Sequence, residues 1–213
     1  MKRNILKLSM LSTLAMGAAS AHADTPSAEL KVIGSIDAPT CTVNPVNDGV
    51  YDFGPISNTL IKLGNEHTAL DPITQTWTVS CDSSTYLTFT VEDNRKDTAS
   101  IVNTTYFGLG SVNDTGKLGY YTVKLKKPQV DGSDARTFAG TSPSNNTETP
   151  LYDAASGLKH GWSTVSGQLQ AGTVFTADLE VSPMLGGSGN MNGVPTERVD
   201  LDGSLTLTFS YGL

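Results

Sequence analysis

Residues 28–41 read Ala-Glu-Leu-Lys-Val-Ile-Gly-Ser-Ile-Asp-Ala-Pro-Thr-Cys. From position 28 to position 36 every second residue is apolar or glycine, and the positions between are mostly polar. This period of two predicts an amphipathic β-strand, with Ile33 as its one exception. Gly34 interrupts the apolar face, which is costly unless another chain segment approaches closely there. Because Pro39 cannot donate a ladder hydrogen bond, we expect the strand to end before the first cysteine.

The first 23 residues predict a secretory signal peptide. Three basic residues precede an apolar run over 8–19, and small residues at positions 21 and 23 are typical of a cleavage site. The apolar run is too short to span a membrane, and no stop-transfer segment follows it. We expect a mature chain of 190 residues that begins at Asp24, a length that suits one domain with a sizeable core.

The predicted mature chain is strongly acidic. Residues 1–23 hold three of the fourteen basic residues and none of the twenty-one acidic ones, so the mature net charge is −10. An acidic surface disfavours nucleic acid and anionic membrane surfaces as partners. We therefore expect no nucleic-acid partner and no membrane insertion.

The two cysteines, Cys41 and Cys81, predict a single disulfide, because an even number of cysteines in an exported protein is typical of an oxidised pair. The bond would close a loop of about 41 residues and stabilise the fold by roughly 4 kcal/mol in the chain-entropy description. Their spacing excludes a CxxC redox pair. The mature chain adds only His67 and His160 as further strong metal ligands, so we expect no metal site and no cofactor.

Strand-like alternation recurs along the chain, and no helical period is sustained for three turns. The predicted strands cover 73–81, 87–91, 121–126, 173–181 and 201–211, and turn-rich stretches separate them. Their threonine-rich outer faces are typical of half-exposed antiparallel strands. This pattern predicts an all-β, immunoglobulin-like β-sandwich. The Ser/Asn/Pro-rich stretch at 141–150 is expected to be a long surface loop.

No group of residues carries the signature of a catalytic site. The glycine-rich stretch at 186–189 lacks the Lys-Ser/Thr of a phosphate-binding loop, and His160 has no nucleophile elbow near it. Trp77 lies on the inward face of its predicted strand, whereas Trp162 has small flanking residues and is the better candidate of the two for an exposed aromatic that could stack on a sugar. We expect no enzymatic activity and no catalytic residue.

In their order along the chain, these features resemble pilin subunits of the chaperone–usher family, and specifically a less characterised, fimbrial-like branch. The resemblance rests on the spacing from Gly34 to Cys41, the spacing from Cys41 to Cys81, and a hydrophobic last strand that ends close to Tyr211. It extends over most of residues 24–213. The tracts that carry it are Cys41-Thr42-Val43, Asp52-Phe53-Gly54 and Val91-Glu92-Asp93-Asn94-Arg95.

The resemblance implies an immunoglobulin-like sandwich that lacks its last strand and is completed by donor-strand exchange. The gap is a hydrophobic groove, filled first by a periplasmic chaperone and then by the N-terminal extension of the next subunit. The implied donor side chains are Ala28, Leu30, Val32, Gly34 and Ile36. The implied acceptor and chaperone-binding strand contains Leu205, Leu207, Phe209, Tyr211 and Leu213, with the Leu213 carboxylate facing a basic anchor of the chaperone.

This interpretation divides the chain into a signal peptide at 1–23, a donor-strand extension at 24–36 and a pilin-like domain at 37–213. The last strand departs from the family pattern in two places. Tyr211 is followed by two residues instead of one, and Val199 stands where the family has a glycine.

The leading hypothesis is a structural subunit of a bacterial surface fimbria, exported through the periplasm and contributing to cell adhesion. Its implied partners are neighbouring pilin subunits, a periplasmic chaperone and an outer-membrane usher. One alternative is a minor or tip subunit that binds a host glycan, suggested by Trp162 and the long loops at 141–170 and 183–198. Another is a self-complemented periplasmic protein that does not polymerise, suggested by the departures in the last strand.

Overall fold

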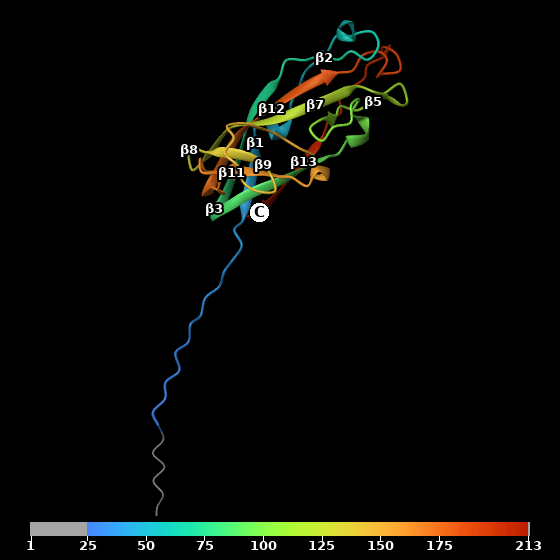
Figure 1. Cartoon of the computed structure of the whole chain (residues 1–213). Helices are drawn as coiled ribbons and strands as arrows, with labels where there is room; N and C mark the ends of the chain where they lie inside the picture. Colours follow the sequence, from blue (N-terminus) through green and yellow to red (C-terminus); the bar gives the residue numbers. More distant parts are fainter. Residues whose placement is uncertain (1–24, 213) are drawn as a thin grey trace, which may run out of the picture. The chain divides into compact units, whose positions relative to one another are not determined.

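A computed structural model describes residues 25–212, and they form an all-β protein (Figure 1). Within this part of the chain, helical structure is restricted to four short 3₁₀ turns, which are η1 (Val46–Gly49), η2 (Asn58–Leu60), η3 (Lys96–Thr98) and η4 (Ala154–Ser156). None of these described helices is long and apolar enough to cross a membrane. The predicted all-β class is confirmed. The predicted signal peptide, Asp24 and Leu213 lie outside the described residues.

Three long antiparallel strands organise a curled sheet, with β12 between β7 and β3 (Figure 1). The strands are β1 (Cys41–Pro45), β2 (Thr68–Ala69), β3 (Ile73–Asp93), β4 (Phe107–Gly108), β5 (Ser111–Val112), β6 (Gly116–Lys117), β7 (Gly119–Val130), β8 (Ser133–Asp134), β9 (Arg136–Gly140), β10 (Thr149–Pro150), β11 (Lys159–Ser163), β12 (Ala171–Leu185) and β13 (Leu205–Tyr211). The short strands β5 and β6 form a separate two-stranded ribbon. The loop expected at 141–150 ends in the short strand β10.

The strand β3 runs through two parts of the curled sheet, which differ in the strands that pair with it. Its first half pairs with β1 and β12, and its second half pairs with β11 and β13. The alternation predicts two strands, 73–81 and 87–91, and the residues between them include Asp82, Ser83 and Ser84. These three side chains are exposed, but the backbone remains in strand conformation through them. One continuous element therefore connects the two parts.

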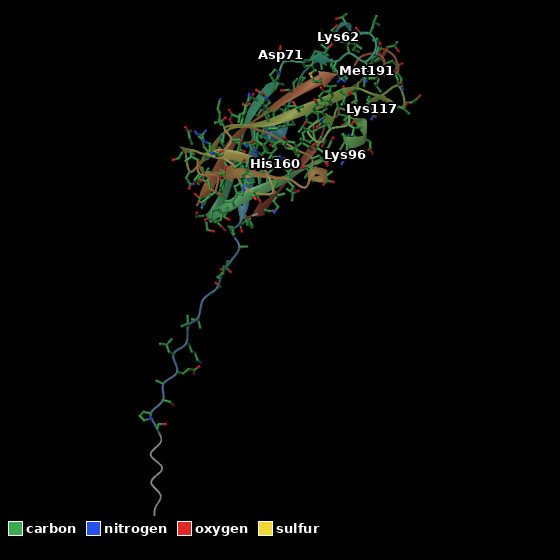
Figure 2. The ribbon with its side chains drawn as sticks, in the orientation of Figure 1. Lys62, Asp71, Lys96, Lys117, His160 and Met191 are labelled. Carbon is green, nitrogen blue, oxygen red and sulfur yellow. A yellow bond between two sulfur atoms is a disulfide. The ribbon has the colours of Figure 1, made fainter. Side chains whose placement is uncertain are left out.

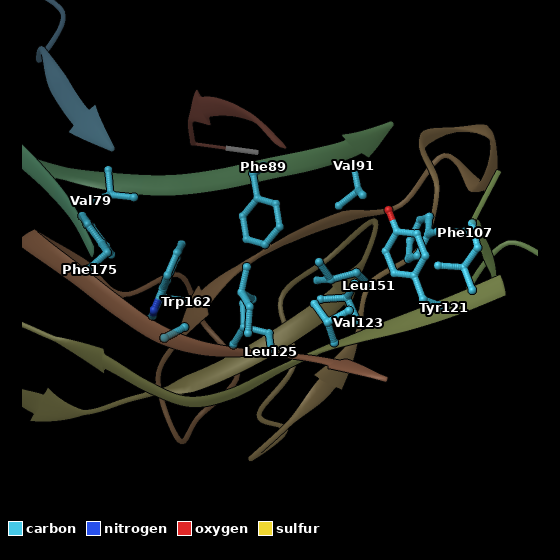
Figure 3. Close-up of a cluster of buried hydrophobic side chains, with 14 of the residues drawn as sticks. Val79, Phe89, Val91, Phe107, Tyr121, Val123, Leu125, Leu151, Trp162 and Phe175 are labelled. Carbon is cyan, nitrogen blue, oxygen red and sulfur yellow. The ribbon is translucent and has the colours of Figure 1, made fainter. Parts of the chain in front are cut away.

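The inward faces of β3, β7 and β12 form one hydrophobic core. Phe89 and Val91 point from β3 toward Val123 and Leu125 of β7 (Figure 3), and all four side chains are buried. Burying a side chain of this size contributes roughly 1.5–3 kcal/mol each. The period-two alternation thus identified the core faces of the long strands correctly.

The extension at 25–37, taken by itself, has no regular secondary structure. Its apolar side chains Leu30, Val32, Ile33 and Ile36 are each at least 85% exposed. A single extended segment without a partner strand has nothing to satisfy its main-chain groups except water, so strand formation requires pairing. The role of this segment as a donor strand stays a prediction.

Trp162, the better candidate for an exposed aromatic, is buried instead. Its side chain is only 3% exposed, and its indole Nε1 donates to the carbonyl oxygen of Thr176 at 2.9 Å. A Cβ atom added to Gly161 would lie 2.8 Å from the carbonyl oxygen of Leu87. The small neighbour of Trp162 thus reflects close packing and not an exposed loop.

The last strand begins later than the alternation predicted. β13 starts at Leu205 and not at position 201, because tertiary contacts draw the preceding residues away from the ladder. The Asp202 carboxylate forms an ion pair with Arg95. A Cβ atom at Gly203 would lie 2.8 Å from the ring of Tyr121, so the backbone packs tightly there.

The predicted disulfide between Cys41 and Cys81 is confirmed. The two residues are directly opposite each other on β1 and β3, with their Cα atoms 4.0 Å apart. The neighbouring pair, Thr40 and Asp82, is hydrogen-bonded, since the Asp82 N–H donates to the Thr40 carbonyl oxygen. By alternation the cysteines form a non-hydrogen-bonded pair, the class in which antiparallel residues approach most closely.

Replacing both cysteines by serine should lower the free energy of unfolding by roughly 4 kcal/mol, because the unfolded chain regains the freedom of a loop of about 41 residues. Urea unfolding of the double variant beside the oxidised wild type would measure the loss, and the reduced wild type is the matched control. Two free thiols in an intact-mass measurement of the oxidised protein would contradict the pairing.

His160, on β11, is fully buried inside the curl (Figure 2). Its Nε2 accepts a hydrogen bond from the Tyr152 N–H at 3.0 Å, and its ring stacks on Phe89 with the centroids 5.2 Å apart. Burial lowers the pKa of His160 to about 4. The folded protein therefore holds this imidazole in the neutral form at neutral pH.

This burial predicts a pH-dependent stability. In the unfolded chain a histidine titrates near its ordinary pKa of roughly 6.5, so the unfolded state gains a proton before the folded state does. The contribution of the neutral His160 to the free energy of unfolding is complete above that pH, and it falls by about 3 kcal/mol as the pH drops to about 4. Urea unfolding across this range should show a slope that His160→Gln reduces and the control His67→Gln retains. Parallel profiles for the wild type and His160→Gln would refute this account.

Candidate functional site

The strand β13 has a partner along one edge only. It pairs with β3, and within residues 38–212 no strand pairs with its other edge. The Gly212 N–H donates to the Tyr86 carbonyl oxygen, and the Asn94 N–H donates to the Ser204 carbonyl oxygen. Because hydrogen-bonded pairs alternate in an antiparallel ladder, the even-numbered residues of β13 turn their main chain toward β3. The N–H and C=O groups of residues 205, 207, 209 and 211 therefore point to the unpaired edge.

The same odd-numbered residues present their side chains to the core without being fully covered. Leu205, Leu207 and Phe209 are half-buried, and Tyr211 is 46% exposed. Phe209 packs on the fully buried Phe89 of β3, with ring centroids 5.3 Å apart. The core is therefore open along the free edge of β13. The structure thus brings together four of the five predicted acceptor residues, while their role as acceptors remains a prediction.

A second unpaired segment, residues 50–58, lines the same opening. Tyr51 and Phe53 pack against the core, while Asp52 and Gly54 are exposed, which is a short strand-like alternation. Among the described residues, the main chain of 51–56 makes one hydrogen bond, from the Gly54 N–H to the adjacent Asp52 carboxylate. This segment therefore offers a second main-chain edge without a sheet partner.

Side chains, and not a sheet ladder, anchor this second edge. The Tyr51 hydroxyl donates to the Leu179 carbonyl oxygen at 3.1 Å and accepts from the Trp77 Nε1 at 3.1 Å. The Gln75 side-chain amide donates to the Val50 carbonyl oxygen at 2.7 Å. Burial raises the pKa of Tyr51 to about 12, so its hydroxyl stays protonated and able to donate.

Together these surfaces form one feature, which we call the open groove. Its lining comprises Tyr51, Phe53, Trp77, Leu201, Leu205, Leu207 and Phe209. At its wide end, a cavity of about 970 Å³ separates residues 50–58 from residues 195–201. A separate void of about 20 Å³ lies inside the core, between Trp77, Leu207, Phe209 and buried side chains such as Phe89 and Leu125. Lys62, Lys117 and Met191 mark the end of the domain where the loops gather (Figure 2).

The chemistry of the open groove suits an extended apolar segment. Its interior is hydrophobic, its wide end carries a charged rim that includes Asp52, Glu197 and Arg198, and its walls carry unpaired main-chain groups. Such edges bind a strand through ladder hydrogen bonds, and the hydrophobic interior receives alternate side chains. Among the described residues, no group of three or more His, Cys, Asp or Glu side chains is arranged to hold a metal ion.

Sequence reasoning identified the β13 wall of the groove and missed the other wall. The segment 50–58 has too short an alternation, broken by Gly54 and Pro55, to be recognised as a strand. Its Asp52-Phe53-Gly54 tract was noted only as part of a resemblance. Trp77 was correctly expected to face inward, but its position at the opening of the core was not foreseen. The predicted donor residues lie in the extension, and Leu213 lies outside the described residues.

Comparison with known proteins adds three similarities. Residues 30–122 match a family described as "Protein of unknown function (DUF1120)". The chain is 24% identical to Protein GltF of Escherichia coli strain K12, over 99% of this chain and 98% of that protein. It is 23% identical to Uncharacterized protein YhcF of the same strain, over 98% of this chain and 99% of that protein. The similarity to both relatives spans the whole length of each chain.

Proposed function

We propose that this protein is a structural subunit of a bacterial surface fimbria, assembled by donor-strand exchange. The observation that carries the proposal is the free edge of β13, whose Leu205, Leu207 and Phe209 are only half-buried against the core. In this interpretation the curled sheet is an immunoglobulin-like sandwich that lacks one strand. The missing strand comes from a neighbouring subunit.

The extension at 24–36 has the properties that such a groove requires. Its apolar positions alternate through Ala28, Leu30, Val32 and Ile36. Inserted beside β13, the segment would pair its main chain with the free edge and bury alternate side chains in the groove. Nine residues from 28 to 36 are sufficient to cover the seven residues of β13.

The open groove also explains why such a subunit would need a chaperone. An unpaired strand edge with exposed apolar side chains is prone to associate with other chains. We propose that a periplasmic chaperone covers this edge after export and that an outer-membrane usher directs the exchange. The protein would then reach the cell surface as part of a fimbria and contribute to adhesion.

The two alternatives are affected differently by the structure. The tip-adhesin hypothesis loses its proposed aromatic platform, because Trp162 is buried in the core. The self-complemented form, in which the extension fills the groove of its own chain, predicts a stable monomer. The assembly and truncation experiment described below distinguishes this form from a subunit that polymerises.

Gly34→Asn should prevent subunit assembly without affecting the fold of the monomer. Within the extension itself, no atom lies within 4 Å of a Cβ added at Gly34, so this segment has room for a side chain there. In a filled groove, a side chain at this position of the apolar face would clash, which typically costs 1–3 kcal/mol. Ser35→Asn is the matched control, because it places the same side chain on the polar face of the extension. Light scattering of the purified chains would measure polymer formation, and thermal unfolding would measure monomer stability.

Normal polymers from Gly34→Asn would overturn the donor-strand assignment. So would a chain that lacks residues 24–36 but is as stable as the full chain, if the full chain itself never oligomerises or binds a chaperone. A full chain that stays monomeric, and is more stable than the truncated one, would identify the self-complemented form instead.

A further inference from the structure

The strands β1 and β13 lie one after the other along the same edge of β3. β1 pairs with residues 77–81 of β3 and β13 with residues 87–93, and both run antiparallel to β3. β12 pairs with β3 on the opposite edge, at residues 77–80 and again at Tyr86, whose carbonyl oxygen accepts from the Gly212 N–H on the side of β13. Figure 3 shows β1, in blue, and β13, in dark red, on the same side of β3. The two strands therefore point the same way along β3.

This arrangement determines where the extension joins the domain. Thr40 lies opposite Asp82, whose N–H donates to its carbonyl oxygen. Gly212 is bound to Tyr86, only four residues further along β3. Pro39 lacks an N–H, so the chain leaves the β3 ladder just before Thr40. A straight continuation of the extension along β3 would meet the end of β13, and the extension must therefore step aside.

The tether decides the direction in which the extension can enter the groove of its own chain. Thr40 lies beyond the C-terminal end of β13, and the seven residues of β13 span about 20 Å. An extension antiparallel to β13 would bring Ile36 to Leu205, at the far end of that strand. The four residues that connect Ile36 to Thr40 reach at most about 14 Å, which is too short. A parallel extension needs only a sideways step of about 4.8 Å, the spacing of neighbouring strands.

The extension is also long enough to lie along the whole of β13. Eleven residues lead from Thr40 back to Glu29 (40 − 29), and ten lead along β3 from Asp82 to Glu92 (92 − 82). Glu92 pairs with Thr206, near the start of β13. Residues at the same level of neighbouring parallel strands share a face. With Glu29 level with Thr206, the apolar positions of the extension share the face of the half-buried side chains of β13.

We propose that in an unassembled subunit the extension occupies the open groove of its own chain as a strand parallel to β13, and that the extension of a neighbour displaces it during assembly. The inference rests on the proposed function, because it assumes the same groove and the same segment. It differs from the self-complemented alternative, because the occupant remains exchangeable. A short tether gives the extension an effective concentration of roughly 1 mM, so its own groove is filled before that of a dilute neighbour. The extension thus covers the free edge until another subunit arrives.

Paired cysteines test the direction of this strand. The mature chain, with its native disulfide intact, carries Glu29→Cys together with Thr206→Cys. The matched control combines Ser35→Cys with the same Thr206→Cys, and all three positions are exposed. In a parallel strand, position 35 lies about 20 Å beyond the level of position 29 and is out of reach of a short bismaleimide crosslinker. The Glu29 pair should therefore give at least about tenfold more crosslinked monomer than the control pair, with a yield that dilution does not change.

The same variant tests whether the occupant is exchangeable. An excess of unlabelled peptide of residues 24–37, added before the crosslinker, should lower the yield of crosslinked monomer, because the peptide competes for the groove. An unchanged yield would overturn the displacement step.

The remaining outcomes separate this inference from the proposed function. A control pair that crosslinks within the monomer as well as the Glu29 pair does would overturn the parallel strand. So would the absence of crosslinked monomer from both pairs, if light scattering shows that the unmodified chain still forms polymers. The absence of both crosslinked monomer and polymers would overturn the proposed function as well.

Discussion

The unpaired edge of β13 is the constraint on which the rest of this structure depends. Four residues of that strand direct main-chain N–H and C=O groups away from β3, and three of their side chains are only half covered. Unpaired polar backbone beside apolar side chains is unfavourable, because water can satisfy one and not the other. This edge also gives meaning to the features near it. Residues 50–58, the cavity and the Tyr51 anchor matter because they shape what can approach the edge.

The two walls of the groove are held by different kinds of interaction. β13 is fixed by a regular ladder to β3, whereas residues 50–58 are fixed at one end by the Tyr51 hydroxyl and the Gln75 amide. A ladder distributes its stability over many main-chain bonds, whereas the wall at 50–58 depends on side-chain contacts, to which Phe53 adds by packing on the core. The two walls of the groove are therefore built differently.

Much of the fold followed from alternation, and the failures have physical reasons. The strands at 73–81 and 173–181 were predictable because each has one apolar face that is buried in the core. Trp162 was misjudged because small flanking residues can indicate either an exposed loop or very close packing, and only the tertiary structure distinguishes them. β13 begins at Leu205 because the Asp202 N–H donates to the Leu109 carbonyl oxygen, which takes the preceding backbone away from the β3 ladder. Half of the candidate groove was foreseen, and the wall at 50–58 was not, because its position depends on side chains that bond across more than twenty residues.

The disulfide has a mechanical consequence. A tensile force applied to the extension reaches the hydrogen bonds between Thr40 and Asp82 first. It then passes through the sulfur atoms of Cys41 and Cys81, so the disulfide shields the β1–β3 hydrogen bonds beyond it. The loaded strand, β3, is the one whose residues 87–93 hold β13. Tension would therefore travel along a covalent path to the strand that borders the groove.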